Sequence, residues 1–152
     1  MTQLKAGDKA PNFVAVTHEG ENISLVDFAG TKLILYFYPK DNTPGCTAQA
    51  CSLRDGHEEL LGLGYRVIGV SPDGVKSHTT FRAKHNLPFT LIADTGRDLA
   101  KTYGVYGEKK LYGKPVMGVH RTTFIIDANG IIERVISRVD TKDHVRQILE
   151  AN

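Results

Sequence analysis

Two cysteines five residues apart are the side chains of this chain whose type and spacing most directly suggest chemistry. Cys46 follows Thr43-Pro44-Gly45. Thr43 is a good helix N-cap, and Pro44 suits the first helical position because its missing N–H needs no partner there. Cys46 is then the third helical residue, where free backbone N–H groups and the helix dipole favour a thiolate, the reactive form of cysteine. The alternative is a small apolar side chain buried near a helix start.

The distance from Cys46 to Cys51 argues against a static disulfide. Five residues of intact helix rise about 7.5 Å and rotate about 140°, which separates the two Cα atoms by roughly 8–9 Å. A disulfide needs Cα atoms within about 7 Å. A bond between these cysteines therefore requires the first helical turns to unwind, and Gly45 and Gly56 weaken that helix. Such a bond would be a step in a cycle, with Cys46 attacking and Cys51 resolving; the alternative is two unrelated buried thiols.

A metal site is disfavoured. A four-ligand zinc site would need two further ligands near the cysteines, and the six histidines form no close pair at zinc-finger spacing. We therefore expect neither a metal nor an organic cofactor.

The elements around Cys46 predict how it is positioned. Residues 32–38 form a continuous apolar run, which is typical of a central strand buried on both faces. Pro39 ends this strand, and a helix is expected over residues 43–63, with its apolar face formed by Ala50, Leu53, His57, Leu60 and Leu61. Open α/β sheets place their chemistry in this strand–loop–helix step, beyond the carboxyl end of a central strand.

The rest of the chain predicts alternating strands and helices. Asn129-Gly130 between two β-rich runs is a strong hairpin signal. We expect an α/β fold, a three-layer sandwich with a central mixed β-sheet flanked by helices. The expected strands are 65–71, 89–93, 122–127 and 131–136, with short extended pieces at 10–16 and 21–26 around a turn at 19–20 and a turn at 27–30. The expected helices are 75–85, 96–103 and 140–151, and the longest irregular stretch is 104–118.

Length and charge exclude several classes of function. The chain has 152 residues, of which 41% are hydrophobic and 24% charged, and this size suits one domain over residues 1–152. A net charge of +2 gives no reason to expect nucleic acid or an anionic membrane surface as a partner. No apolar run approaches the ~18 residues that span a bilayer. The N-terminus lacks the apolar core of a signal peptide, so a cytoplasmic location is expected.

Together these motifs resemble the peroxiredoxin family. Pro39-x-x-x-Thr43-x-x-Cys46 matches the family's active-site signature, and Cys51 resembles the resolving cysteine of the bacterioferritin-comigratory-protein subfamily, also called PrxQ. The segments 10–13, 113–114 and 118–124 match that subfamily in the same order, so the resemblance runs from about residue 7 to 150. It implies a single thioredoxin-like domain and a thiol peroxidase.

The resemblance also implies roles for individual residues. Cys46 is the peroxidatic cysteine, Thr43 hydrogen-bonds the thiolate and the peroxide, and Pro39 shields the pocket. Arg121, from a distant strand, places a guanidinium beside the sulfur, whereas its sequence alone suggests a surface ion-pair partner. The neighbouring His120 is expected to point to the opposite face, and no base is needed. Asp41 and Asn42 are expected to be turn formers.

The resulting hypothesis is a monomeric cytoplasmic peroxidase of hydrogen peroxide and organic hydroperoxides, recycled by thioredoxin through a Cys46–Cys51 disulfide. One alternative is a redox sensor or holdase that uses the same disulfide as a switch. The other is a disulfide reductase that needs no peroxide.

Overall fold

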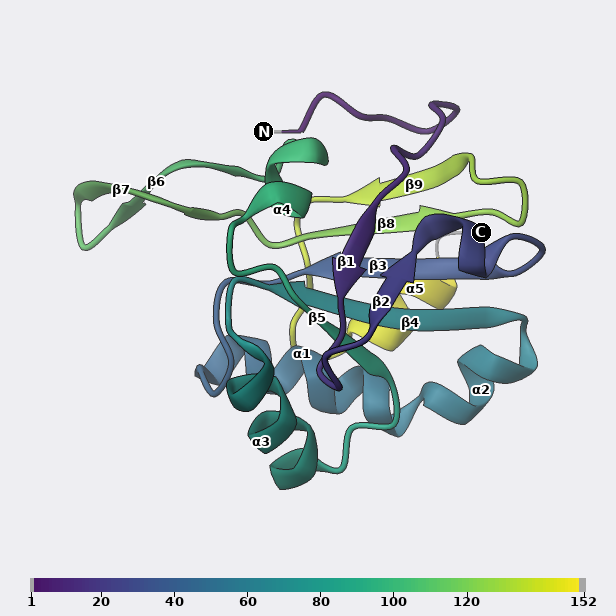
Figure 1. Ribbon diagram of the computed structural model, residues 1–152, viewed down its shortest axis with the longest axis horizontal. Helices are drawn as coiled ribbons and strands as arrows, with labels where there is room; N and C mark the ends of the chain where they lie inside the picture. The colour runs from purple at the N-terminus through teal and green to yellow at the C-terminus, as the bar shows by residue number, and fades with distance from the viewer. Residues whose placement is uncertain (1, 151–152) are drawn as a thin grey trace.

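A five-stranded mixed sheet runs through the middle of the molecule, with the strand order β5-β4-β3-β8-β9. The computed structural model describes residues 2–150. The central strand β3 is parallel to β4 and antiparallel to β8; β5 is parallel to β4, and β9 is antiparallel to β8 (Figure 1). The strands are β3 (Lys32–Phe37), β4 (Tyr65–Ser71), β5 (Thr90–Ala93), β8 (Thr122–Ile126) and β9 (Ile132–Ile136).

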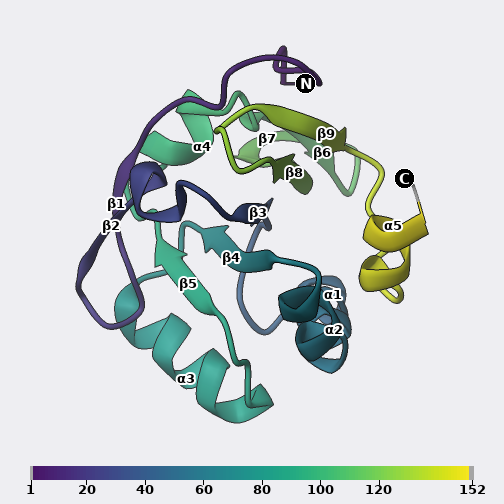
Figure 2. The same cartoon turned by 90° about the vertical axis from the view of Figure 1, so that its right-hand side faces the viewer.

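An apolar core covers each face of the sheet. This agrees with β3, which is buried along almost its whole length. Its alternate side chains enter two separate cores, Leu33 and Leu35 on one face and Ile34 and Tyr36 on the other. One core lies under α1 (Pro44–Asp55), α2 (His57–Gly62), α3 (Val75–His85) and α5 (His144–Glu150). The opposite core lies under α4 (Asp98–Thr102), the 3-10 helix η1 (Leu25–Phe28), and the short antiparallel pair β1 (Val14–Val16) and β2 (Asn22–Ser24), as Figure 2 shows. The three-layer α/β sandwich with a mixed sheet is therefore confirmed.

Most predicted elements are present. The strand 65–71 and the helix 75–85 have the predicted bounds, and β8 and β9 form the predicted hairpin. The turn at 27–30 falls partly in η1, and the last helix starts at His144 rather than 140. Residue 151, the predicted end of that helix, lies outside the described residues. Within residues 2–150, every helix is too short or too polar to cross a bilayer.

The single helix predicted over residues 43–63 is wrong, because the chain forms two helices that meet at Gly56. Gly56 has φ −100° and ψ 8°, which ends α1 before α2 begins. A Cβ atom at this position would lie 2.6 Å from Cγ1 of Val145, so the glycine lets α5 approach the break closely. Of the two leucines predicted at the end of the apolar face, Leu60 is buried, whereas Leu61 is 42% exposed.

The irregular stretch predicted at 104–118 is also wrong. It forms the hairpin of β6 (Tyr106–Leu111) and β7 (Lys114–Val119), which projects from the sheet at the left of Figure 1. Both residues of its turn, Tyr112 and Gly113, have positive φ, as a two-residue hairpin turn requires. The prediction failed because these strands are largely exposed and lack the apolar alternation of a half-buried strand.

Candidate active site

Cys46 lies at the start of α1, just beyond the carboxyl end of β3. Thr43 has the extended backbone of an N-cap, and its carbonyl accepts a hydrogen bond from the Thr47 N–H at 2.9 Å. Pro44 occupies the first helical position, as predicted. The Cys46 side chain is only 2% exposed. The local sequence thus places a buried sulfur where the first-turn N–H groups have no acceptor within the helix.

The Thr43 side chain differs from its expected geometry. Its hydroxyl donates to the Lys40 carbonyl at 2.9 Å and makes no capping bond to the helix. The expected donation from this hydroxyl to the Cys46 sulfur is therefore not the arrangement in this structure. Because its proton is directed to Lys40, the Thr43 oxygen retains lone pairs that can accept a hydrogen bond.

Arg121 lies just before β8, the strand that pairs with β3, and its guanidinium contacts Cys46. Its Nη2 donates to the Cys46 sulfur at 3.3 Å. A Cβ atom on Gly45 would lie 3.2 Å from the same Nη2, so the glycine leaves room for the guanidinium. Arginine stays charged at any physiological pH. The structure brings the Arg121 guanidinium to Cys46, as the resemblance implied, and places a charged donor where it can bond to a negatively charged sulfur.

Gln49 is a site residue that the sequence reasoning missed. Its side chain is fully buried, and its Oε1 accepts a hydrogen bond from Nη1 of Arg121 at 2.7 Å. Its Nε2 has no hydrogen-bond partner among the described residues. Gln49 follows Cys46 by three residues, and helical residues at this spacing share a face, which is the signal that would have found it. Gln49 holds the guanidinium so that its other nitrogen reaches the sulfur.

Cys51 lies one and a half turns beyond Cys46 on the same helix. Both cysteines are free, and Cys51 is half-buried. Helix α1 runs without interruption from Pro44 to Asp55. The two sulfurs are therefore held apart in the way that the spacing predicts for an intact helix.

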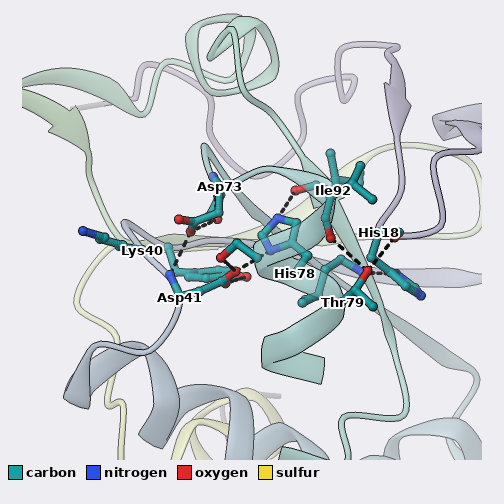
Figure 3. Close-up of polar contacts among 12 residues, drawn as sticks. His18, Lys40, Asp41, Asp73, His78, Thr79 and Ile92 are labelled. Atoms are coloured by element: carbon teal, nitrogen blue, oxygen red, sulfur yellow. Dashed lines mark hydrogen bonds and ion pairs between the residues drawn. The ribbon is translucent and has the colours of Figure 1, made fainter. Parts of the chain in front are cut away.

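Asp41 is more than the turn former that the sequence suggested. Its carboxylate is buried and accepts hydrogen bonds from the Tyr38 hydroxyl at 2.7 Å and from the Ser77 hydroxyl and His78 Nδ1 at 2.8 Å (Figure 3). Burial alone would raise the pKa of Asp41, but the hydrogen bonds from His78 and Tyr38 lower it below its usual value. Asp41 is therefore an ionised carboxylate in the interior. Its neighbour Asn42 has a φ of +63°, as expected of a turn residue.

Other aromatic and basic side chains near Cys46 contribute to the pocket in different ways. Tyr36 and Tyr38 are stacked with ring centroids 5.4 Å apart and belong to the same core as Cys46. Burial, and then the charge of Cys46, raises the pKa of Tyr36 well above its ordinary value, so its phenol remains protonated. His120 faces away from Cys46, since its Nε2 lies 3.1 Å from the Glu108 carbonyl on β6. Pro39 is half-buried at the end of β3.

Comparison with known proteins identifies the class of protein that this fold and site define. The model of the AhpC/TSA family matches residues 6–135. The chain is 44% identical over 147 residues to the peroxiredoxin Bcp of Bacillus subtilis, covering 97% of this chain and 94% of the relative. It is 45% identical over 144 residues to the peroxiredoxin Bcp of Escherichia coli K12, covering 95% and 92%.

The structure is also similar to that of the bacterioferritin comigratory protein of Xanthomonas campestris, which has been studied for its alkyl peroxide reduction activity. The TM-score is 0.85 at 34% identity, covering 91% of this chain and 88% of that one. The chain therefore belongs to the AhpC/TSA family and is a thioredoxin-fold peroxiredoxin. Within that class it is a member of the Bcp/PrxQ subfamily, and it is a thiol peroxidase that reduces peroxides.

Proposed function

We propose that Cys46 is the peroxidatic cysteine and that it reduces hydrogen peroxide and organic hydroperoxides. The observation that carries this proposal is the guanidinium of Arg121, 3.3 Å from a buried sulfur at a helix start. The Cys46 thiolate attacks one peroxide oxygen, and the O–O bond breaks. The sulfur is oxidised to a sulfenic acid, and the leaving oxygen takes up a proton to become water or an alcohol. The alkyl peroxide activity of the Xanthomonas campestris relative supports the organic substrates.

Arg121, Thr43 and Pro39 assist this step in different ways. The charge of Arg121 stabilises the thiolate and the negative charge that builds on the leaving oxygen, which is the larger benefit because it is greatest in the transition state. The Thr43 oxygen accepts a hydrogen bond from the peroxide O–H, since its own proton is directed to the Lys40 carbonyl. Pro39 covers the pocket and limits the access of water.

The second half of the proposed cycle uses Cys51. The first turns of α1 unwind, and the Cys51 thiol condenses with the Cys46 sulfenic acid, forming the S–S bond and releasing water. Thioredoxin, a dithiol reductant of the cytoplasm, then reduces the disulfide by exchange. Because both cysteines belong to one chain, this chemistry needs no second subunit, and we propose a monomer.

Two cysteine variants test the scheme. Cys46→Ser is expected to abolish peroxide reduction, whereas Cys51→Ser still consumes one equivalent of peroxide and then stalls. One equivalent of peroxide should remove two hydrogens from the mass of the wild-type chain without forming a dimer. Full peroxidase activity in Cys46→Ser would overturn the proposal.

A steady-state assay separates this proposal from the alternatives. With peroxide, thioredoxin and thioredoxin reductase present, the proposed enzyme turns over continuously. A redox sensor or holdase would oxidise once without turnover, and a disulfide reductase would act on protein disulfides when no peroxide is present.

A further inference from the structure

A buried polar network fastens the loop that leads into the active site. This peroxidatic loop, Pro39–Thr43, joins β3 to α1. The backbone N–H of Asp41 donates to Oδ2 of Asp73 at 2.8 Å, and the same Asp73 oxygen accepts from the Ser71 hydroxyl at 2.6 Å. The Asp41 carboxylate is bonded to His78 of α3 in addition (Figure 3). The middle of the loop is thus held by both its backbone and its side chain.

Both ring nitrogens of His78 lie within hydrogen-bond distance of an oxygen atom. Its Nε2 lies 2.8 Å from the Ile92 carbonyl on β5, which can only accept, so Nε2 carries a hydrogen. Its Nδ1 lies 2.8 Å from Asp41, an ionised carboxylate that also accepts from Tyr38 and Ser77. The ring of His78 is therefore held between Asp41 of the loop and Ile92 of β5. Asp41 and His78 form a buried hydrogen-bonded pair whose side chains are 1% and 0% exposed.

The burial of α3 does not depend on this hydrogen-bonded pair alone. Phe81 of α3 already lies fully buried in the core under the sheet. A second residue of α3, Thr79, ties the helix to the β1–β2 turn through the His18 carbonyl at 3.0 Å. What the bond between Asp41 and His78 adds is a fixed position for the loop. A buried hydrogen bond is demanding in geometry, because a partner left alone is an unsatisfied polar group.

The fixed loop determines where Thr43 and its acceptor lie. The Lys40 carbonyl, which receives the Thr43 hydroxyl proton, directly precedes Asp41. A shift of Asp41 would therefore move that carbonyl, redirect the hydroxyl and move Pro39. Within residues 2–150 the hydrogen bonds of Asp41 go to residues outside α1, so the loop keeps its anchors when the first turns of α1 unwind.

We propose that His78 and Asp41 are a positioning pair for peroxide reduction: the buried hydrogen bond between α3 and the peroxidatic loop holds Thr43 and Pro39 in the geometry that the attack of Cys46 requires. The pair acts on the oxidation of Cys46 and not on the formation of the disulfide. This inference rests on the proposed function of Cys46, because it assigns the pair to one step of that cycle.

Two substitutions of His78 separate its two bonds. In His78→Asn the amide nitrogen lies near the position of Nδ1 and can still donate to Asp41. In His78→Gln it lies near Nε2 and can donate only to Ile92. The rate constant for Cys46 oxidation, measured by competition with horseradish peroxidase for hydrogen peroxide, should fall on the order of 10- to 100-fold in His78→Gln, as expected for a misplaced reacting group. His78→Asn should retain more of it.

The remaining measurements test whether the pair acts on Cys46 oxidation alone and not on disulfide formation. Asp41→Asn should also slow oxidation, while the conversion of sulfenic acid to disulfide, followed by quenched alkylation and mass, stays at the wild-type rate in all three variants. Thr79→Val is the matched control, since it removes a bond between α3 and another segment without touching the loop, and it should oxidise normally.

The proposal is overturned if Asp41→Asn and His78→Gln, the two variants that lose the bond between Asp41 and His78, oxidise at the wild-type rate. It is also overturned if both steps slow equally, or if His78→Gln outperforms His78→Asn. A variant that fails to fold leaves the other two to decide. Failure of the proposed function itself would be seen separately, as peroxidase activity that survives Cys46→Ser.

Discussion

The segments on the two sides of Cys46 are held by different kinds of interaction. Before Cys46, the peroxidatic loop is fixed through Asp41. The Asp41 carboxylate is hydrogen-bonded to Ser77 and His78, and the Asp41 N–H donates to the Asp73 carboxylate. After Cys46, the C-terminal half of α1 is held against α5 by the close packing of Gly56 on Val145 and by one longer bond, from the Val145 N–H to Oγ of Ser52 at 3.3 Å. The peroxidatic loop is thus anchored by polar groups, whereas the C-terminal half of α1 is held mainly by apolar contact.

This difference suits the two halves of the proposed cycle. A buried network of hydrogen bonds resists displacement, because separating it leaves buried polar groups without partners. Apolar contacts and a single weak hydrogen bond can be broken and remade at smaller cost. The loop can thus keep its shape through the cycle while α1, the element that must unwind, detaches from α5.

The largest effect is expected from Arg121, the charge that connects the two sides. Arg121→Gln should lower kcat/KM for peroxide by about 100- to 1000-fold, the range for losing a preorganised donor to a transition-state charge. Arg121→Lys should lie between, because it keeps the charge but cannot bind Cys46 and Gln49 with one planar group. Competition for peroxide measures both.

The exposed Arg146 on α5 provides the control for Arg121. Its partners are Asp143 and Glu150, and Arg146→Gln should leave kcat/KM unchanged. Wild-type activity in Arg121→Gln would show that the guanidinium is not part of the peroxide site.

A smaller effect is expected at the break between α1 and α2. Gly56→Ala places a Cβ within 2.6 Å of Val145 and should lower the free energy of unfolding by about 1–3 kcal/mol, as overpacking does. Urea denaturation of the reduced protein measures this loss. Cys46 oxidation should be unaffected, because the loop side is held separately. The double variant Gly56→Ala/Val145→Ala should recover stability; if it does not, α5 is not what the glycine accommodates.

Removal of the hydrogen bond between Ser52 of α1 and Val145 of α5 should have a still smaller effect. Ser52→Ala loses the acceptor for the Val145 N–H and should cost roughly 0.5–1.5 kcal/mol of unfolding free energy. Conversion of sulfenic acid to disulfide should become faster, since α1 is released from α5 more easily. The exposed Ser137→Ala serves as control. A slower conversion in Ser52→Ala would contradict the view that α5 restrains the helix.

The smallest effect is expected from the titration of His144. Burial lowers the pKa of His144 from 6.5, although its bond to Gln147 partly opposes this. The unfolded chain therefore binds the proton more readily, and the free energy of unfolding falls as the pH drops below about 6.5. His144→Asn should lose less stability than wild type between pH values of about 7.5 and 5.5. Equal losses would mean that the titration of His144 does not contribute to the pH dependence of stability.

The sequence predicted the parts of the site that depend on local spacing. The N-cap, the proline and the cysteine follow one another at Thr43, Pro44 and Cys46, so the helix start follows from neighbouring residues. Arg121 comes from 75 residues away, and only the family resemblance pointed to it. The buried contact between Asp41 and His78 had no signal in the sequence, because aspartate is common in turns and a histidine in an exposed helix looks the same as one in a buried contact.

The fold was predicted where strands are buried and missed where they are not. Apolar runs gave β3 and β4 almost to the residue. The hairpin of β6 and β7 was missed because burial, the source of the pattern, is slight along it. The break at Gly56 depends on Val145, a residue of the last helix, and such tertiary packing leaves no mark in the local periodicity.

The uninterrupted course of α1 from Pro44 to Asp55 has a consequence for how the protein responds to its surroundings. A sugar or another osmolyte that is excluded from the protein surface favours the folded α1 helix over its unwound state, which exposes more surface. It would then protect the protein against heat and at the same time reduce turnover at saturating peroxide. Thermal stability and turnover rate would therefore change in opposite directions, both through the twelve residues of α1.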